Sequence, residues 1–93
     1  MSIRIVAVRF SGGTTHQHIV RLWWMEPSTS EAGDNSRAEI ISWIESENGK
    51  AYVEDTSGNR VDVGIVKPVQ GEKYLRTHAD GVWTNNLLAL PRR

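Results

Sequence analysis

Residues 3–10 read I-R-I-V-A-V-R-F, a dense β-branched run in which Arg4 and Arg9 do not follow the spacing of an amphipathic helix. A second β-rich run, H-Q-H-I-V-R-L-W-W-M, stands at residues 16–25. The segment S-G-G-T-T between them has the composition of a turn. Together the three segments predict an antiparallel hairpin on which the rest of the chain packs.

One helix is predicted to follow this hairpin. Residues 36–39 read S-R-A-E and fit a capping box, in which the serine oxygen accepts from the third helical amide and the glutamate reaches back to the serine amide. Three isoleucines then recur at helical spacing, and Asn48-Gly49 supplies a C-terminal stop. These three are Ile40, Ile41 and Ile44. Residues 26–34, rich in Pro, Ser and Gly, are expected to form a surface loop before the helix.

The second half of the chain predicts three more strands. Residues 51–56 and 60–69 flank the turn S-G-N, and residues 73–77 form a short fifth strand. The tail, residues 78–91, reads mostly as turn, with one helical turn at 86–89. We therefore predict a small α+β fold in β-β-α-β-β-β order, with a mainly antiparallel sheet and one covering helix.

Length and composition limit what this chain does. Ninety-three residues with 39% hydrophobic content are expected to form one domain over residues 1–93. Eleven basic residues balance eleven acidic ones, which argues against a nucleic-acid partner. The absence of cysteine excludes disulfides, thiolate nucleophiles and Cys-type zinc sites. No apolar run is long enough to span a membrane, so we expect no membrane partner and a cytoplasmic location.

No pattern in the sequence assembles a catalytic site. His16 and His18 would share one face of a strand and His78 could join them, but no acidic residue completes a local ligand set. No G-x-S-x-G motif or complete phosphate-binding loop is present. We expect a protein that is not an enzyme and that carries no metal or cofactor.

Trp23 and Trp24 are adjacent on the second predicted strand, so their rings must point to opposite faces of the sheet. The sequence does not say which of the two lies in the core. The other needs a cover, which is the loop at 26–34, the C-terminal tail, a partner subunit or a ligand. We expect a homo-oligomer, a dimer, whose interface includes Arg21, Trp23 and Met25.

The charges are unevenly placed. Residues 1–25 hold three arginines and no acid, whereas residues 26–49 hold six acidic residues and one basic residue. The plain interpretation is a solvated helix beside a basic hairpin. The alternatives are an anion-binding groove lined by Arg4, Arg9 and Arg21, or a head-to-tail contact between subunits.

The C-terminal segment, residues 74–91, gathers polar and aromatic side chains on irregular backbone. It reads Y-L-R-T-H-A-D-G-V-W-T-N-N-L-L-A-L-P. We expect a ligand-binding surface here, with Arg76 on an anionic or carbonyl group, Trp83 stacking and the two asparagines hydrogen bonding. The candidate ligand-binding residues are Arg76, Thr77, His78, Asp80, Trp83, Asn85 and Asn86. The alternative is a folding clasp, in which Asn85 is a helix cap and Arg76 a partner for Asp80.

Both ends of the chain carry a family resemblance. The segments I-V-A-V-R at 5–9 and Y-L-R followed by G and N-N-L-L-A-L-P resemble a family of small bacterial and phage domains of unknown function. That resemblance implies a small domain without an assigned activity. At the level of class alone, with no motif matched, the chain is also similar to phage anti-Thoeris sponges, which sequester a cyclic nucleotide signal without cleaving it.

These observations favour a non-enzymatic binding module for a polar or anionic, nucleotide-like ligand, of which a phage-type sequestering protein is one form. The alternative is an adaptor that uses the same surface for a protein partner or a second copy. The sequence does not identify the ligand or the pathway.

Overall fold

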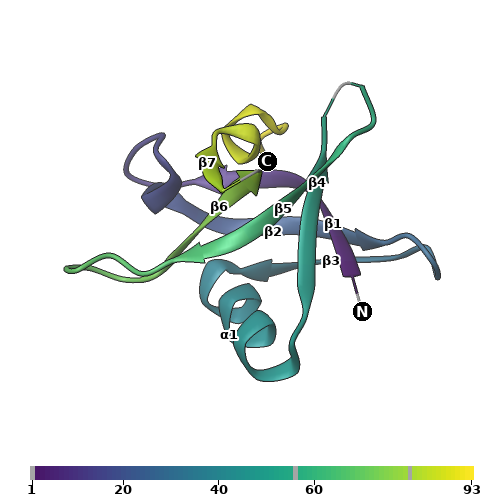
Figure 1. Cartoon of the computed structure of the whole chain (residues 1–93), viewed down its shortest axis with the longest axis horizontal. Coiled ribbons are helices and arrows are strands. Elements are labelled where there is room, and N and C mark those ends of the chain that lie inside the picture. The colour runs from purple at the N-terminus through teal and green to yellow at the C-terminus, as the bar shows by residue number, and fades with distance from the viewer. Residues whose placement is uncertain (1, 56, 80) are drawn as a thin grey trace.

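The computed structural model describes residues 2–55, 57–79 and 81–93. These residues form one helix and a seven-stranded mixed sheet (Figure 1). The strands are β1 (Ser2–Phe10), β2 (Ile19–Glu26), β3 (Glu31–Ser36), β4 (Lys50–Glu54), β5 (Arg60–Val66), β6 (Tyr74–Ala79) and β7 (Val82–Thr84). The helix α1 spans Arg37–Glu47, and two 3-10 turns, η1 and η2, cover His16–His18 and Asn86–Ala89.

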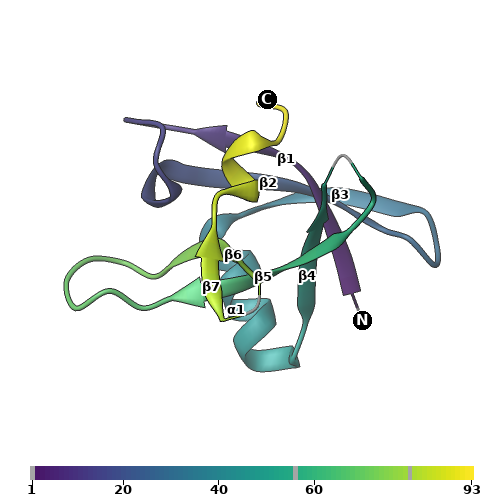
Figure 2. The same ribbon diagram turned by 45° about the horizontal axis from the view of Figure 1, so that its top comes forward.

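The sheet has the order β3-β2-β1-β4-β5-β6-β7. Neighbouring strands are antiparallel except for β1 and β4, which run parallel. The residues of β1 that pair with β4 are its first ones, Ser2, Ile3 and Arg4. Beyond η2 the tail returns to the other end of β1, where Arg92 bridges to Val8 (Figure 2). The chain thus brings its last residues beside its first strand.

The predicted α+β class, the β1–β2 and β4–β5 hairpins and the single helix are confirmed, but the predicted strand order is wrong in two places. The segment at 26–34 is not wholly loop, because β3 begins at Glu31. The tail is not only turn, because β7 pairs with β6. β3, with the sequence E-A-G-D-N-S, lacks the β-rich composition that marks a strand, and β7 has only three residues, V-W-T. Both lie at the edges of the sheet, where a neighbour already in place supplies the ladder.

The second predicted strand begins later than expected. His16, Gln17 and His18 form the 3-10 turn η1, so the two histidines do not share a strand face. A register shift also lies between the pairs Arg9–Arg21 and Phe10–Ile19. This irregularity adds one residue to β2 and turns Ile19 to the same side as Leu22, and both are buried. A strict alternation of faces along β2 therefore breaks between Ile19 and Arg21.

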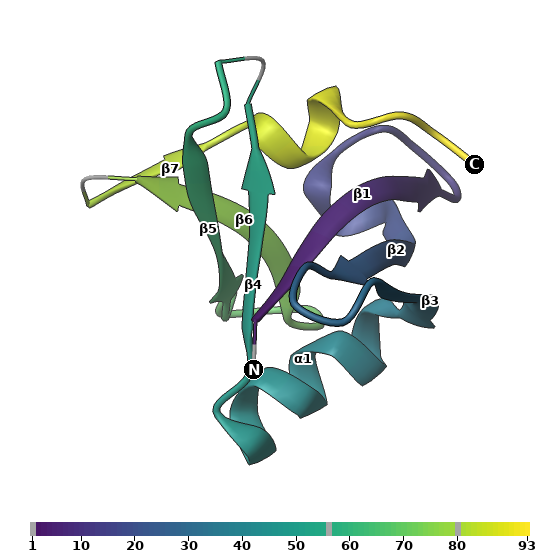
Figure 3. The ribbon, with the colours of Figure 1, turned by 90° about the vertical axis from the view of Figure 1, so that its right-hand side faces the viewer.

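The predicted helix signals are confirmed. Ser36 is the N-cap; its Oγ accepts from the Glu39 amide at 3.2 Å, and a Glu39 carboxylate oxygen accepts from the Ser36 amide at 2.9 Å. Asn48 ends the helix in the left-handed conformation, with φ of 52°. Ile40 and Ile41 are buried and Ile44 packs half-buried against the core, so the helix covers the sheet as predicted (Figure 3).

The core lies between the sheet, α1 and η2. Its fully buried members come from β1, β2, β4, β6 and η2: Ile5, Val8, Ile19, Leu22, Val53, Leu75, Thr77 and Leu87. Leu87 belongs to η2 and packs with the strand residues. This leucine therefore anchors the tail on the core.

Candidate functional site

The predicted ligand-binding segment folds as a hydrogen-bonded clasp around Thr77. This side chain is 0% exposed, and its hydroxyl donates to the Thr84 carbonyl at 3.1 Å. The same oxygen accepts from the Asn86 amide at 3.1 Å and lies 2.7 Å from the Thr84 hydroxyl. The Thr84 hydroxyl lies equally close, 2.7 Å, to the Asn86 side-chain oxygen. Thr77, Thr84 and Asn86, which we call the threonine clasp, therefore satisfy one another inside the protein.

Arg76 adds to this clasp from the same strand. Its Nε donates to the Thr84 carbonyl at 3.1 Å and one terminal nitrogen donates to the Asn85 side-chain oxygen at 3.0 Å. Two nitrogens of its guanidinium group thus already donate hydrogen bonds within the chain. Asn85 stands at the N-cap position of η2 but makes no side-chain capping bond, so its predicted capping role is wrong. Its amide oxygen binds Arg76 instead.

His78 and Trp83 lie outside the clasp and remain exposed. Trp83 is 41% exposed, and its ring meets the His78 ring edge-on with 5.1 Å between centroids. The Trp83 ring also covers Gly64 of β5, where an added Cβ would lie 3.1 Å from two ring atoms. This glycine makes room for the ring on the sheet. Asp80, the remaining predicted ligand residue, lies outside the described residues.

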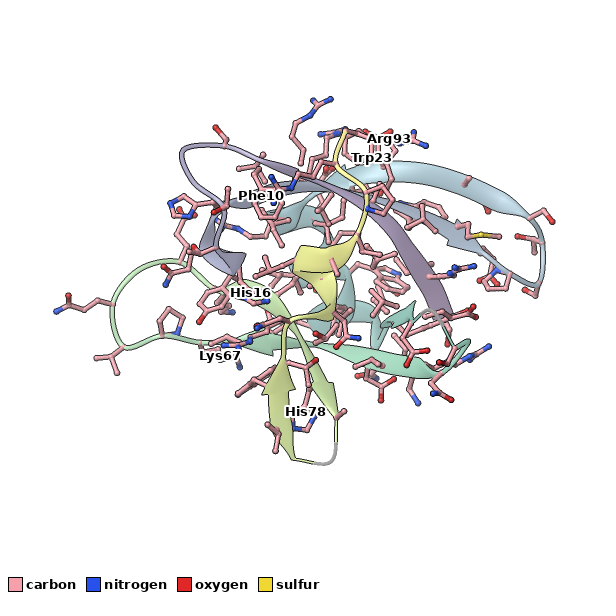
Figure 4. The ribbon with its side chains drawn as sticks, turned by 90° about the horizontal axis from the view of Figure 1, so that it is seen from above. Phe10, His16, Trp23, Lys67, His78 and Arg93 are labelled. Atoms are coloured by element: carbon pink, nitrogen blue, oxygen red, sulfur yellow. The ribbon has the colours of Figure 1, made fainter. Side chains whose placement is uncertain are left out.

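His16 lies inside the molecule, well apart from His78 (Figure 4). Its side chain is 7% exposed, and its Nε2 has no hydrogen-bond partner among the described residues. Burial lowers the pKa of His16, and the positive charge of Arg76 lowers that pKa further. The neutral imidazole is therefore the stable form beside the clasp. The sequence pattern placed this histidine on a strand face and gave no signal of its burial.

The three residues predicted as an interface lie on β2. Arg21 forms an ion pair with Asp34 of β3. Met25 is half-buried between Arg4 of β1 and Ala32 of β3. Trp23 is half-buried and lies under two guanidinium groups of its own chain.

Those two guanidinium groups belong to Arg9 and Arg93, at 5.1 Å and 5.7 Å from the Trp23 ring centroid. The tail positions Arg93 beside β1: the amide of Arg93 donates to the Val8 carbonyl at 3.0 Å, and Arg9 Nε donates to the Arg93 carbonyl at 2.9 Å. Figure 4 shows Trp23 and Arg93 together at the outer edge of the molecule. We call Arg9, Trp23 and Arg93 the arginine–tryptophan surface.

The arginines of this surface differ from three other arginines in their charge partners. In the described parts of the chain, Arg4, Arg21 and Arg37 each lie within 4.0 Å of an Asp or Glu carboxylate oxygen, whereas Arg9 and Arg93, like Arg60, Arg76 and Arg92, have no such ion pair. A guanidinium group stacked on an aromatic face keeps its in-plane N–H groups free for a planar or phosphate anion. Arg9 belongs to the anion-binding groove that the sequence suggests, whereas Arg93 does not, because the tail carries no signal of where it docks.

Comparison with known families shows to which family the chain belongs. A family model described as a protein of unknown function, DUF3892, matches residues 4–91. The chain belongs to this family. The match includes both segments that carried the family resemblance. The prediction that this chain is a domain of unknown function is therefore confirmed, and the family is DUF3892. Comparisons with curated proteins and with solved structures found no match.

No helix of the described residues is long and apolar enough to cross a membrane. No three His, Asp or Glu side chains among them gather as metal ligands would.

Proposed function

We propose that this protein is a non-enzymatic binding module for a small anionic ligand of the nucleotide type, bound at the arginine–tryptophan surface. The observation that carries the proposal is the pair of guanidinium groups held over Trp23 without a carboxylate partner in the described residues. Backbone pairing of the tail to Val8 fixes Arg93, and the Arg93 carbonyl fixes Arg9. Preorganised donors of this kind lose little entropy when they bind a phosphate.

The proposal moves the ligand away from the threonine clasp. A ligand at Arg76 would have to displace hydrogen bonds to Thr84 and Asn85, and breaking them would expose buried partners of Thr77. Among the described residues, the terminal nitrogens of the Arg9 and Arg93 guanidinium groups make no hydrogen bond within the chain. An anion therefore binds there without unfolding a local network.

The test is a calorimetric titration with AMP and with uncharged adenosine at low ionic strength. We expect AMP to bind and adenosine to bind at least about tenfold more weakly, because the phosphate supplies the charge-assisted bonds. Arg9→Gln and Arg93→Gln should each weaken AMP binding about tenfold. Arg60→Gln is the matched control, since Arg60 also stacks on an aromatic ring, 4.3 Å from that of Tyr52, at another place.

An equal loss in Arg60→Gln would mean that AMP senses overall charge and not this surface. No AMP binding to the wild-type protein would overturn the proposal for nucleotide anions.

A second candidate function is self-association through β7. This strand lies at one edge of the sheet, and its Val82 and Trp83 are 62% and 41% exposed. An exposed apolar edge strand is a template for pairing with another chain. Light scattering should then show a dimer that Val82→Lys dissociates, while Val69→Lys, at a fully exposed loop position, leaves it intact. A wild-type monomer at all concentrations excludes this candidate.

A further inference from the structure

A second, separate site lies where α1 crosses β1, β2 and β3. The space between helix and sheet holds a partly open cavity of about 160 Å³. It is lined by Ile3, Trp24, Asn35, Glu39, Ile40 and Trp43. A cavity of about 150 Å³ in a protein interior is known to admit a benzene-sized molecule. Figure 3 shows the helix lying against this end of the sheet.

Two glycines hold the two indole rings that line this cavity. Trp43 lies directly on Gly49, where an added Cβ would come within 2.5 Å of three ring atoms. Trp24 lies on Gly33 of β3, where an added Cβ would be 2.9 Å from Trp24 Cζ2. No side chain larger than hydrogen fits behind either ring without displacing it. The backbone therefore supports both tryptophans from behind, next to the cavity.

Hydrogen bonds fix the polar part of the lining. Trp24 Nε1 donates to the Asn35 side-chain oxygen at 2.8 Å, which sets the orientation of that ring. Glu39 lies exposed at the rim, and one of its carboxylate oxygens accepts from the Ser36 amide. Hydrogen bonds from Ser36 and then from Asn35 lower the pKa of Glu39, so its carboxylate is ionised at neutral pH. The nearest cation on β2, Arg21, is engaged by Asp34.

We propose that this cavity binds a small organic ammonium ion carrying methyl groups. Two indole rings attract a cation through their negative faces, and apolar side chains accommodate methyl groups. Glu39 adds a formal negative charge at the rim, which disfavours an anion and favours a cation over a neutral molecule of the same shape. A trimethylammonium group is close to benzene in size, so it fits the volume. This site does not depend on the arginine–tryptophan surface.

The experiment compares choline with its neutral isostere, 3,3-dimethylbutan-1-ol, by tryptophan fluorescence at constant ionic strength. A Trp83→Phe background removes the exposed indole of β7 from the signal. We expect choline to bind at least about tenfold more tightly than the isostere. Replacing Trp43 with Leu should weaken both ligands, because it removes one wall.

Glu39→Gln is the decisive variant. Glutamine also serves in a capping box, so the helix start is retained while the charge is removed. Choline affinity should fall about fivefold and the affinity for the isostere should stay the same. Glu47→Gln, at the exposed last residue of α1, is the control with the same change in net charge and should leave choline binding unchanged.

Equal binding of choline and the isostere, or insensitivity of choline to Glu39→Gln, would overturn the cation assignment in favour of a neutral apolar ligand. An absence of choline binding in the wild-type protein would overturn it as well. If Trp43→Leu does not fold, the pair of glutamate variants still decides the question.

Discussion

The threonine clasp and the arginine–tryptophan surface are built from similar residues and use them in opposite ways. In the clasp, Arg76 donates to a carbonyl of its own chain and to Asn85, beside a fully buried Thr77. On the arginine–tryptophan surface, Arg9 and Arg93 stack on Trp23 and have no carboxylate partner in the described residues. Arg76 holds the tail through two donor groups, whereas among the described residues Arg9 donates through its Nε alone, to the Arg93 carbonyl.

This difference shows that residue type alone does not mark a binding site. Arg, Asn and Trp at 76–86 have the composition of a ligand site, yet most of their polar atoms are used within the chain. What separates the two regions is whether donors are already paired by buried partners. The two regions are therefore expected to differ in how much a substitution lowers the free energy of unfolding.

The largest effect is expected at the centre of the clasp. Thr77→Val keeps the shape of the side chain but removes its hydroxyl, which leaves the Thr84 carbonyl with one partner fewer and the Asn86 amide unpaired. We expect a loss of about 2–3 kcal/mol in the free energy of unfolding. Denaturant unfolding of Thr77→Val and of Thr15→Val, an exposed threonine bonded to His18, measures it. A loss no larger than that of Thr15→Val would contradict the clasp.

A smaller effect separates the two kinds of arginine. Arg76→Gln should lower the free energy of unfolding by about 1–2 kcal/mol, because two hydrogen bonds from a charged group are lost. Arg9→Gln should cost about 0.5 kcal/mol or less, as is usual at an exposed position. Thermal melts of both variants test the comparison directly. Equal costs would mean that the two regions do not differ in the way described.

The smallest effect is a dependence on pH through His16. Its pKa in the folded protein lies below the ordinary value of 6.5, so the unfolded chain binds a proton more readily. Stability is then complete above that value and falls as the pH is lowered through it toward the folded pKa. Melting temperatures between about pH 7.5 and 5.5 should decline in the wild-type protein and stay flatter in His16→Gln.

Arg76 provides the control for this pH dependence. Its charge is the second cause of the lowered pKa, so Arg76→Gln should bring the His16 pKa closer to its ordinary value and weaken the slope. A slope that is identical in wild type and His16→Gln would assign the pH dependence to other groups.

Much of the fold was predictable where the signal is local. The capping box at 36–39, the stop at Asn48 and the β-branched runs of β1 and β5 each depend on neighbours in the sequence. β3 and β7 were missed because E-A-G-D-N-S and V-W-T form strands through pairing with β2 and β6. The candidate site was predictable in composition but not in place, since Arg93 and Trp23 meet only after the tail returns to β1.

By itself the sequence determined the class of fold, the single helix and its ends, and the two main hairpins. The tertiary structure alone decided that Trp24 packs against the core while Trp23 lies under Arg9 and Arg93, and that Arg4, Arg21 and Arg37 pair with carboxylates. The physical reason is the separation in sequence between the residues that interact. Caps, turns and strand periodicity are fixed within a few residues, whereas cover, burial and charge pairing join residues as far apart as Arg9 and Arg93.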